Sequence, residues 1–234
     1  GHARLAAVVA GPGVVVEALV AAAAARGVVL MPAHNDRFAP GLDQALAAAR
    51  GRALLVTRLT DRRSPAALHA WHRAPVFEGL YHLAVLAHAH LGAAARLDAV
   101  EWSGDDRPSW IRVRCAGADG ASVQVVWTLT AAVDALIVAA PGVHWRRDGR
   151  HPTLTIDGAP RPVARDGGEL ERMLRGFHRA VRDRGPAPVA AADGAAVMGL
   201  TVAAVDALAA AGAPLARATA PRHVASPALA PRYR

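Results

Sequence analysis

Short apolar runs alternate with helical segments in the first part of the chain. Residues 3–10 and 28–34 have the pattern of buried strands, and the segment between them, 14–27, has helical length and ends in glycine. A helix at 41–51 and a strand at 52–60 follow. This order predicts that the chain opens with a short β-α-β unit of the parallel kind.

From residue 97 to residue 163 the pattern changes to short alternating or β-branched runs separated by turn residues. We expect strands at 97–103, 109–117, 121–130, 133–140, 142–148 and 152–158. Two helices, at 168–185 and 192–212, follow them. The predicted fold class is therefore α+β: a large open, mostly antiparallel sheet with helices packed on one face, preceded by a short β-α-β remnant.

Composition places the chain among globular proteins. Hydrophobic residues make up 53% of it, and the longest apolar stretches are broken before the roughly 20 residues of a membrane span. No signal peptide is visible, and the single Cys115 excludes an internal disulfide and a cysteine-only metal site. We therefore expect a cytoplasmic protein that does not bind membranes.

Arginine supplies all 27 basic residues, and the sequence contains no lysine. Chemistry that needs an ammonium donor or a Schiff-base amine therefore cannot come from a side chain of this sequence. The formal net charge is +8, but the arginines are scattered. Their local excess lies at 216–234, which we expect to be a flexible Arg/Pro/Ala-rich tail. We do not expect the protein to bind nucleic acid.

The apolar segment VFEGLYHLAVLAHAH at 76–90 carries one acid and three histidines. On a helix, Glu78 and His82 share a face and can pair, which is the arrangement of a general acid/base pair. His88 points about 120° away from His82, and His90 lies about 12 Å farther along the helix axis. The three histidines therefore cannot converge on one metal ion from this helix. We predict no metal site, and we expect His88 and His90 at the surface or at an interface.

Three segments carry motifs in a fixed order. GVVLMPAHNDRFAPGLDQAL contains N-x-RF-x-P, with Asn35, Arg37, Phe38 and Pro40 in the motif positions. AWHRAPVFEGLYHLAVLAHAHLG is similar to a W-R … GG-x-x-x-D-x-G-x-H-x-x-D … W-x-x-G segment, and 166–211 is similar to a closing pair of helices with F-x-x-A-x-x-x-G. Together they resemble the Gfo/Idh/MocA (glucose–fructose oxidoreductase, inositol dehydrogenase) family.

The resemblance implies a Rossmann domain with a dinucleotide site, followed by an open-sheet domain that binds substrate and oligomerises. It covers about residues 1–215, which we expect to form a single α+β domain: 1–34 as a remnant of the nucleotide-domain end and 35–215 as the substrate and oligomerisation domain. Family members oxidise or reduce a hydroxyl of a sugar, polyol or similar substrate with NAD(P). The glycine fingerprint, the ribose-binding acid and the lysine of the family's E-K-P motif are absent from this sequence.

The same resemblance assigns candidate site residues. Glu78 stands at the position of the family's aspartate and His82 at that of its histidine, and both are candidates for catalysis. Val85 replaces the aspartate that follows. The candidates for substrate binding are Asn35, Arg37, His72, Arg73 and His178. We expect no cofactor, with NAD(P) relevant only if a nucleotide-binding half is supplied elsewhere.

Three functions remain open. The leading hypothesis is a redox-neutral enzyme that dehydrates, isomerises or cyclises a small sugar-derived or natural-product substrate with His82 and Glu78. The second is a catalytically inactive partner subunit of a full-length family member. The third is an NAD(P)-dependent oxidoreductase whose nucleotide-binding half is missing from this chain. We also expect a homodimer or higher oligomer formed through the open sheet.

Overall fold

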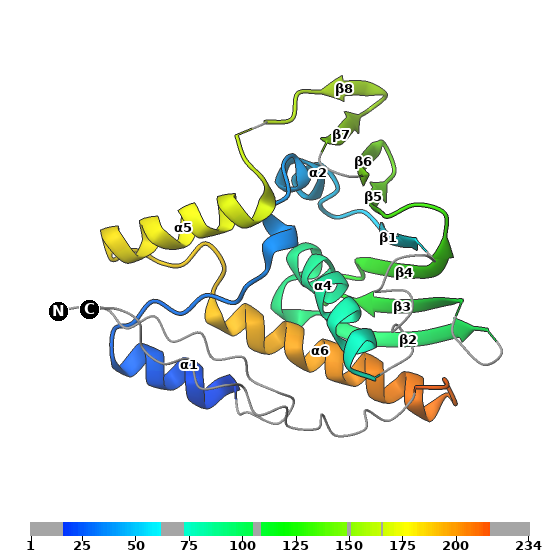
Figure 1. The fold of residues 1–234 in the computed structure, drawn as a ribbon, viewed down its shortest axis with the longest axis horizontal. Helices are drawn as coiled ribbons and strands as arrows, with labels where there is room; N and C mark the ends of the chain where they lie inside the picture. The colour runs from blue at the N-terminus through cyan, green and yellow to red at the C-terminus, as the bar shows by residue number, and fades with distance from the viewer. Residues whose placement is uncertain (1–15, 62–72, 105–108, 149–150, 165, 216–234) are drawn as a thin grey trace, which may run out of the picture.

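Eight strands form one open sheet in the computed structural model of the chain (Figure 1). The structure describes residues 16–61, 73–104, 109–148, 151–164 and 166–215. The strands are β1 (Leu54–Asp61), β2 (Arg96–Ser103), β3 (Trp110–Ala116), β4 (Ser122–Ala131), β5 (Ala135–Ala140), β6 (Val143–Asp148), β7 (His151–Ile156) and β8 (Ala159–Arg161). Their order is β2-β3-β4-β1-β5-β6-β7-β8, with β1 parallel to β4 and the other pairs antiparallel.

The helices of the described residues lie mainly on one side of this sheet. They are α1 (Val16–Ala25), α2 (Leu42–Ala48), α4 (Arg73–Leu91), α5 (Glu169–Asp183) and α6 (Ala191–Ala210), with short 3-10 helices η1 (Asn35–Phe38) and η2 (Gly92–Ala94). Helices α4 and α6 pack on each other, α4 covers β4 and β1, and α6 covers β2 (Figure 1). Helix α2 packs on β6 and β7. The predicted α+β class is confirmed.

Helix α4 is apolar on most sides because it lies between the sheet and α6. Leu83, Val85 and Leu86 are buried on different sides of it, which is the pattern of a core helix and not of a surface helix. Gly79 allows the ring of Trp127 on β4 to approach the helix closely. The indole Nε1 of this tryptophan donates to the Thr60 hydroxyl at 2.9 Å, so its polar edge is satisfied inside the core.

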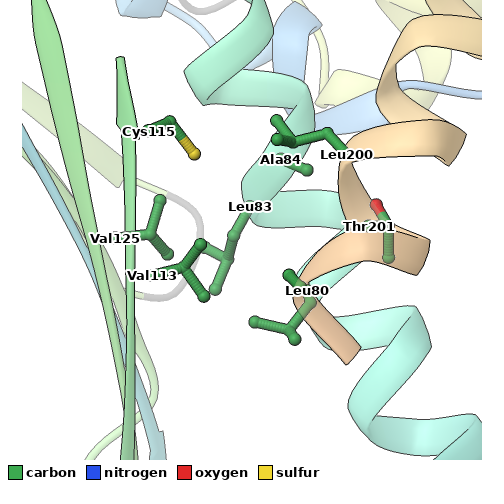
Figure 2. Close-up of a pocket in the computed structure, with 9 residues that line it drawn as sticks. Leu80, Leu83, Ala84, Val113, Cys115, Val125, Leu200 and Thr201 are labelled. Atoms are coloured by element: carbon green, nitrogen blue, oxygen red, sulfur yellow. The ribbon is translucent and has the colours of Figure 1, made fainter. Parts of the chain in front are cut away.

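The layer between α4, α6 and the sheet is closely packed. Figure 2 shows leucine and valine side chains from α4, α6 and the sheet facing one another around a cavity of about 10 Å³. The Thr201 hydroxyl at its edge donates to the Val197 carbonyl at 2.8 Å. Burial, with a smaller effect of Asp98, raises the pKa of the Cys115 thiol to about 11. A space this small and apolar has no room for a substrate, so it belongs to the core.

Two expectations about strands need correction. The predicted strand at 28–34 is wrong, since these residues have no regular secondary structure. Pro32 lacks an amide donor for a sheet ladder, and its carbonyl instead accepts from the His34 amide at 2.8 Å as the chain turns into η1. The strands from 97 onward do not form an uninterrupted meander, because β1 lies between β4 and β5. The first predicted strand, 3–10, and the tail, 216–234, lie outside the described residues.

Helix α6 is long and apolar enough, by length and composition alone, to cross a membrane. Its packing supplies another reason for this composition. Val197, Leu200, Ala204, Val205 and Leu208 are buried inside the protein, where α6 meets α4 and β2. Helix α6 is therefore a core helix of this fold.

Candidate acid–base site

The ring of His82 on α4 meets a carboxylate from η1. His82 Nδ1 lies 2.9 Å from Asp36 Oδ2, and the side chain of His82 is 36% exposed whereas that of Asp36 is 10% exposed. Nδ1 itself is buried, and its contact with the carboxylate is close in distance without the alignment of a directed hydrogen bond. The ring thus has one edge buried against an acid and the rest of it partly open to solvent.

The strand β6 holds Asp36 from the other side. Trp145 Nε1 donates to the Pro40 carbonyl at 2.9 Å and thereby fixes the turn between η1 and α2 against β6. Arg147 lies two residues farther along and therefore on the same face of the strand. Its NH2 donates to Asp36 Oδ1 at 3.1 Å and its NH1 donates to Glu169 Oε1 at 2.8 Å.

These contacts decide the charge of Asp36. Burial alone would raise the pKa of its carboxyl group. The contact with His82 and the guanidinium of Arg147 together outweigh burial and lower the pKa. Asp36 is therefore ionised at neutral pH, in spite of being buried.

A second histidine lies deeper in the same place. His34, which is 1% exposed, has its Nε2 at 2.8 Å from the Tyr81 hydroxyl. Burial first, and the nearby Arg37 second, lower the pKa of His34 to about 4, so its ring is neutral at physiological pH. Burial also raises the pKa of Tyr81, which keeps its hydroxyl protonated. Two consecutive residues of α4, Tyr81 and His82, thus contact His34 and Asp36 at the start of η1.

The N-terminal turn of α6 completes the cluster. Arg37 NH1 lies 3.6 Å from Asp193 Oδ2, and His88 Nε2 lies 4.0 Å from Asp193 Oδ1. The expectation that His88 lies at the surface or at an interface is wrong, because its residue is 6% exposed and burial lowers its pKa. His90 is half-buried, and its Nε2 is 2.9 Å from the Arg52 carbonyl oxygen. Among the described residues, no three His, Cys, Asp or Glu side chains are placed to hold a metal ion.

No hydrogen bond or ion pair of the described residues joins the two predicted catalytic residues. Glu78 is exposed on α4, and the carboxylate at the ring of His82 is Asp36 instead. The expected pairing of Glu78 with His82 is therefore replaced by a contact from a different element. Asp36 lies inside the N-x-RF-x-P motif, between Asn35 and Arg37, so its position in the motif is the signal that could have identified it. Arg147 has no such signal, because the sheet topology alone brings it there.

Only some of the predicted substrate-binding residues lie near His82 and Asp36 among the described residues. Asn35 and Arg37 lie in η1, next to Asp36, and Arg37 takes part in the cluster through Asp193. His178 is exposed on α5, and no hydrogen bond or ion pair of the described residues joins it to the cluster. His72 and the side chain of Arg73 lie outside the part of the chain that the structure describes.

No protein-family model and no curated protein matches this sequence. Solved structures do match. UDP-N-acetylglucosamine 3-dehydrogenase from Acidithiobacillus ferrooxidans has a TM-score of 0.65 and 18% identity over 82% of this chain and 65% of its own. The aldose-aldose oxidoreductase from Caulobacter crescentus, complexed with glycerol, has a TM-score of 0.64 and 18% identity over 84% of this chain and 66% of its own.

A levoglucosan dehydrogenase, in complex with NADH and levoglucosan, has a TM-score of 0.61 and 17% identity over 83% of this chain and 68% of its own. The chain thus spans about two thirds of the length of these proteins. At sequence identities this low, the similarity supports a shared fold alone. Over the part that it spans, the chain has the fold of the Gfo/Idh/MocA-type dehydrogenases.

Proposed function

We propose that this chain carries the acid–base site of an enzyme that moves a proton at a hydroxyl or carbonyl group of a small substrate, without a change of oxidation state. The observation that carries the proposal is the contact of His82 Nδ1 with Asp36 Oδ2 at 2.9 Å, with the remainder of the ring partly open to solvent. Dehydration, isomerisation and cyclisation are the reaction classes that such a site can perform.

The proton of the neutral His82 ring belongs on Nδ1. An unprotonated nitrogen at 2.9 Å from the ionised Asp36 carboxylate would be repelled by it, whereas an N–H is attracted. This tautomer leaves the lone pair of Nε2 as the base. When Nε2 takes a proton from the substrate, the Asp36 carboxylate stabilises the resulting imidazolium, which returns the proton to another atom of the substrate.

Arg147 acts on this pair through Asp36. Its two hydrogen bonds, to Asp36 and Glu169, keep the Asp36 carboxylate ionised and in place. Glu78 is one helical turn before His82 on the same helix and is exposed. We assign it to contact with the substrate, and not to orientation of the ring.

The similar structures support a proposal for the substrate class. The three proteins named above act on a nucleotide sugar, on aldoses and on levoglucosan, respectively. A sugar-derived or similarly hydroxylated carbonyl compound is therefore the substrate class that we propose for this chain, with a product at the same oxidation state.

A nicotinamide dinucleotide, which this fold implies, does not fit the described residues. Among the described elements, the strand-to-helix connection that contains glycines runs from β8 through Gly167 and Gly168 into α5. Asp166, Glu169 and Glu171 surround that helix N-terminus. Their carboxylates would repel a pyrophosphate, which needs free backbone amides and positive potential.

The second candidate function is therefore a dinucleotide-dependent oxidoreductase whose nucleotide site comes from outside these residues. All three similar proteins carry the names of dehydrogenases or oxidoreductases, and one is a complex with NADH. In that case His82 would still move the proton of the reacting hydroxyl, since the sequence offers no lysine for this role.

Exchange of carbon-bound hydrogen with D₂O tests the proposed redox-neutral function. Proton transfer next to a carbonyl exchanges that hydrogen with solvent, whereas direct hydride transfer does not. The probes are D-glucose, D-fructose and dihydroxyacetone, and the readout is ¹H NMR. We expect exchange by the wild-type protein and a loss of about 10²–10⁴-fold in His82→Gln. His151→Gln, which removes an exposed histidine of β7, is the matched control and should exchange at the wild-type rate.

Two results would change the proposed function or the residue assigned as its base. Full exchange by His82→Gln would show that this ring is not the base. Calorimetric binding of NAD(P)H at submillimolar concentration, with no exchange in its absence, would favour the second candidate. A wild-type protein that does neither would leave an inactive partner subunit, for which co-purification with a full-length relative is the test.

We also propose that copies of this chain associate through the face of the sheet opposite the helices. Leu55 on β1 is 37% exposed on that face, beside a shallow groove of about 430 Å³ that Ala139, Ala140 and Pro141 help to line. Light scattering should then give at least twice the 24.2 kDa mass of one chain, and Leu55→Arg should lower it. A monomer in the wild type would contradict this.

A further inference from the structure

The Tyr81–His34 pair is unused by the acid–base chemistry described above. A carbonyl substrate whose neighbouring carbon loses a proton develops negative charge on its oxygen, which needs a hydrogen-bond donor. The cationic groups of the described cluster are already paired with acids: Arg147 with Asp36 and Glu169, and Arg37 with Asp193. The sequence has no lysine to supply an ammonium donor.

The neutral His34 ring has one donor and one acceptor nitrogen, and its surroundings distinguish them. Nε2 is 2.8 Å from the Tyr81 hydroxyl oxygen, and Nδ1 is buried without a hydrogen-bond partner among the described residues. A buried N–H without an acceptor is rarer and more costly in proteins than a lone pair without a donor. The proton of His34 therefore belongs on Nε2, which donates to the Tyr81 oxygen.

This tautomer leaves the hydroxyl hydrogen of Tyr81 unused. A phenol can accept one hydrogen bond and donate another, and accepting one strengthens the one that it donates. The hydrogen bond of this hydroxyl within the described residues is the one to His34. Burial of the ring keeps the phenol protonated, so it can donate across the whole neutral pH range.

Tyr81 is also next to the proposed base. It precedes His82 on α4, and their ring centroids are 6.2 Å apart in an edge-on arrangement. The Phe77 ring is nearly parallel to the Tyr81 ring, with centroids 6.5 Å apart. The two rings are thus neighbours, and the inference requires that one substrate molecule engages both of them.

We propose that Tyr81 is a second catalytic residue, whose hydroxyl donates a hydrogen bond to the carbonyl oxygen of the substrate while His82 Nε2 takes the proton from the adjacent carbon. The C–H bond breaks, its electron pair forms the carbon–carbon double bond of the enolate, and the carbonyl π electrons move onto the oxygen held by Tyr81. No oxidant or reductant is required, and His82 returns the proton to carbon or oxygen. The inference rests on the proposed redox-neutral function.

Two measurements test this inference, one of which needs no activity. The ¹⁵N chemical shifts of His34, assigned by comparison with His34→Gln, report its tautomer in the wild-type protein. We expect a protonated Nε2 and an unprotonated Nδ1. A protonated Nδ1 would overturn the inference, because Tyr81 would then have to donate its own hydrogen to His34. This result is independent of any substrate.

The second measurement is the D₂O exchange rate of Tyr81→Phe, which removes the hydroxyl and little else. We expect a loss of about 10²–10³-fold, the usual cost of removing one donor to a developing oxyanion. The ¹⁵N shifts of His82 should stay close to those of the wild type, which a merely structural role would change. The midpoint of thermal unfolding should fall, because the buried His34 N–H loses its acceptor. Thr153→Val, an exposed hydroxyl deletion on β7, is the matched control.

The outcomes separate this inference from the proposed function. Exchange that is abolished in His82→Gln and unchanged in Tyr81→Phe would refute the role of Tyr81 and leave the proposed function standing. Absence of exchange in the wild type with every probe would refute the proposed function. The His34 tautomer would then still decide whether Tyr81 has a hydrogen to donate. The same measurement decides this if Tyr81→Phe does not fold.

Discussion

Burial of His34 makes the stability of the protein depend on pH in a calculable way. The ring is 1% exposed, and burial with the nearby Arg37 lowers its pKa from 6.5 to about 4. Between these two pH values the unfolded chain holds a proton on this residue and the folded protein does not. The unfolded state therefore gains protons as the pH falls, and the free energy of unfolding decreases.

The magnitude follows from the two pKa values. Linkage gives a loss of about 2 kcal/mol between pH 8 and pH 5, and about 3 kcal/mol by pH 4, from this one ring. The lowered pKa of Asp36 acts in the same direction, but below pH 3.8 and so outside this window. The lowered pKa of His88 adds a loss of the same sign within the window.

The perturbation that isolates the effect is His34→Gln, whose amide can still donate to Tyr81. Urea unfolding, followed by tryptophan fluorescence, gives the free energy of unfolding at pH 8 and at pH 5. Between these pH values the wild type should lose about 2 kcal/mol more than His34→Gln, while the contribution of His88 is common to both. His151→Gln, an exposed histidine, controls for loss of an imidazole. Equal losses in the wild type and in His34→Gln would refute the reasoning.

Two further substitutions test the packing and the charges around the site. Gly79→Ala should lower the free energy of unfolding by about 1–3 kcal/mol, because the new Cβ overlaps the Trp127 ring. Gly199 is a helical glycine of α6 with open space around it, so Gly199→Ala should raise the free energy of unfolding by about 0.5–1 kcal/mol. Thermal unfolding compares the two variants. Arg147→Gln should cost about 3–5 kcal/mol, because it removes the guanidinium from the buried Asp36 carboxylate. Arg146→Gln, which breaks an exposed ion pair on the same strand, should cost less than about 1 kcal/mol. Equal costs for the two arginines, or stabilisation by Gly79→Ala, would contradict the contacts described.

The strands and helices could be predicted from the sequence where side-chain periodicity decides the structure. Alternating runs such as 109–117 and 142–148 became β3 and β6, and the amphipathic segment 168–185 became α5. The run 28–34 is apolar too, but its hydrophobicity alone did not show that Pro32 turns it away from any ladder. Pairing between distant strands is also invisible to local pattern, which is why the place of β1 beside β4 was not predicted.

The candidate site could be predicted in part. Helical spacing, together with the motif resemblance, identified His82 as its centre, and the motif around Asn35 and Arg37 identified the segment that faces it. Helical spacing drew attention to Glu78, which is exposed, and did not identify Asp36 as the carboxylate at the ring, because the fold alone buries it there. Arg147 comes to the site from a distant strand, and only the tertiary structure places it there.

In the proposed function Asp36 makes His82 the base of a redox-neutral reaction, and the variant Asp36→Asn examines this role. This substitution keeps the shape of the side chain and removes the charge that orients and stabilises the ring. In the D₂O exchange assay Asp36→Asn should show a rate about 10²–10⁴-fold below that of the wild type, with His151→Gln unaffected. Exchange by Asp36→Asn at the wild-type rate, in a folded protein, would contradict it.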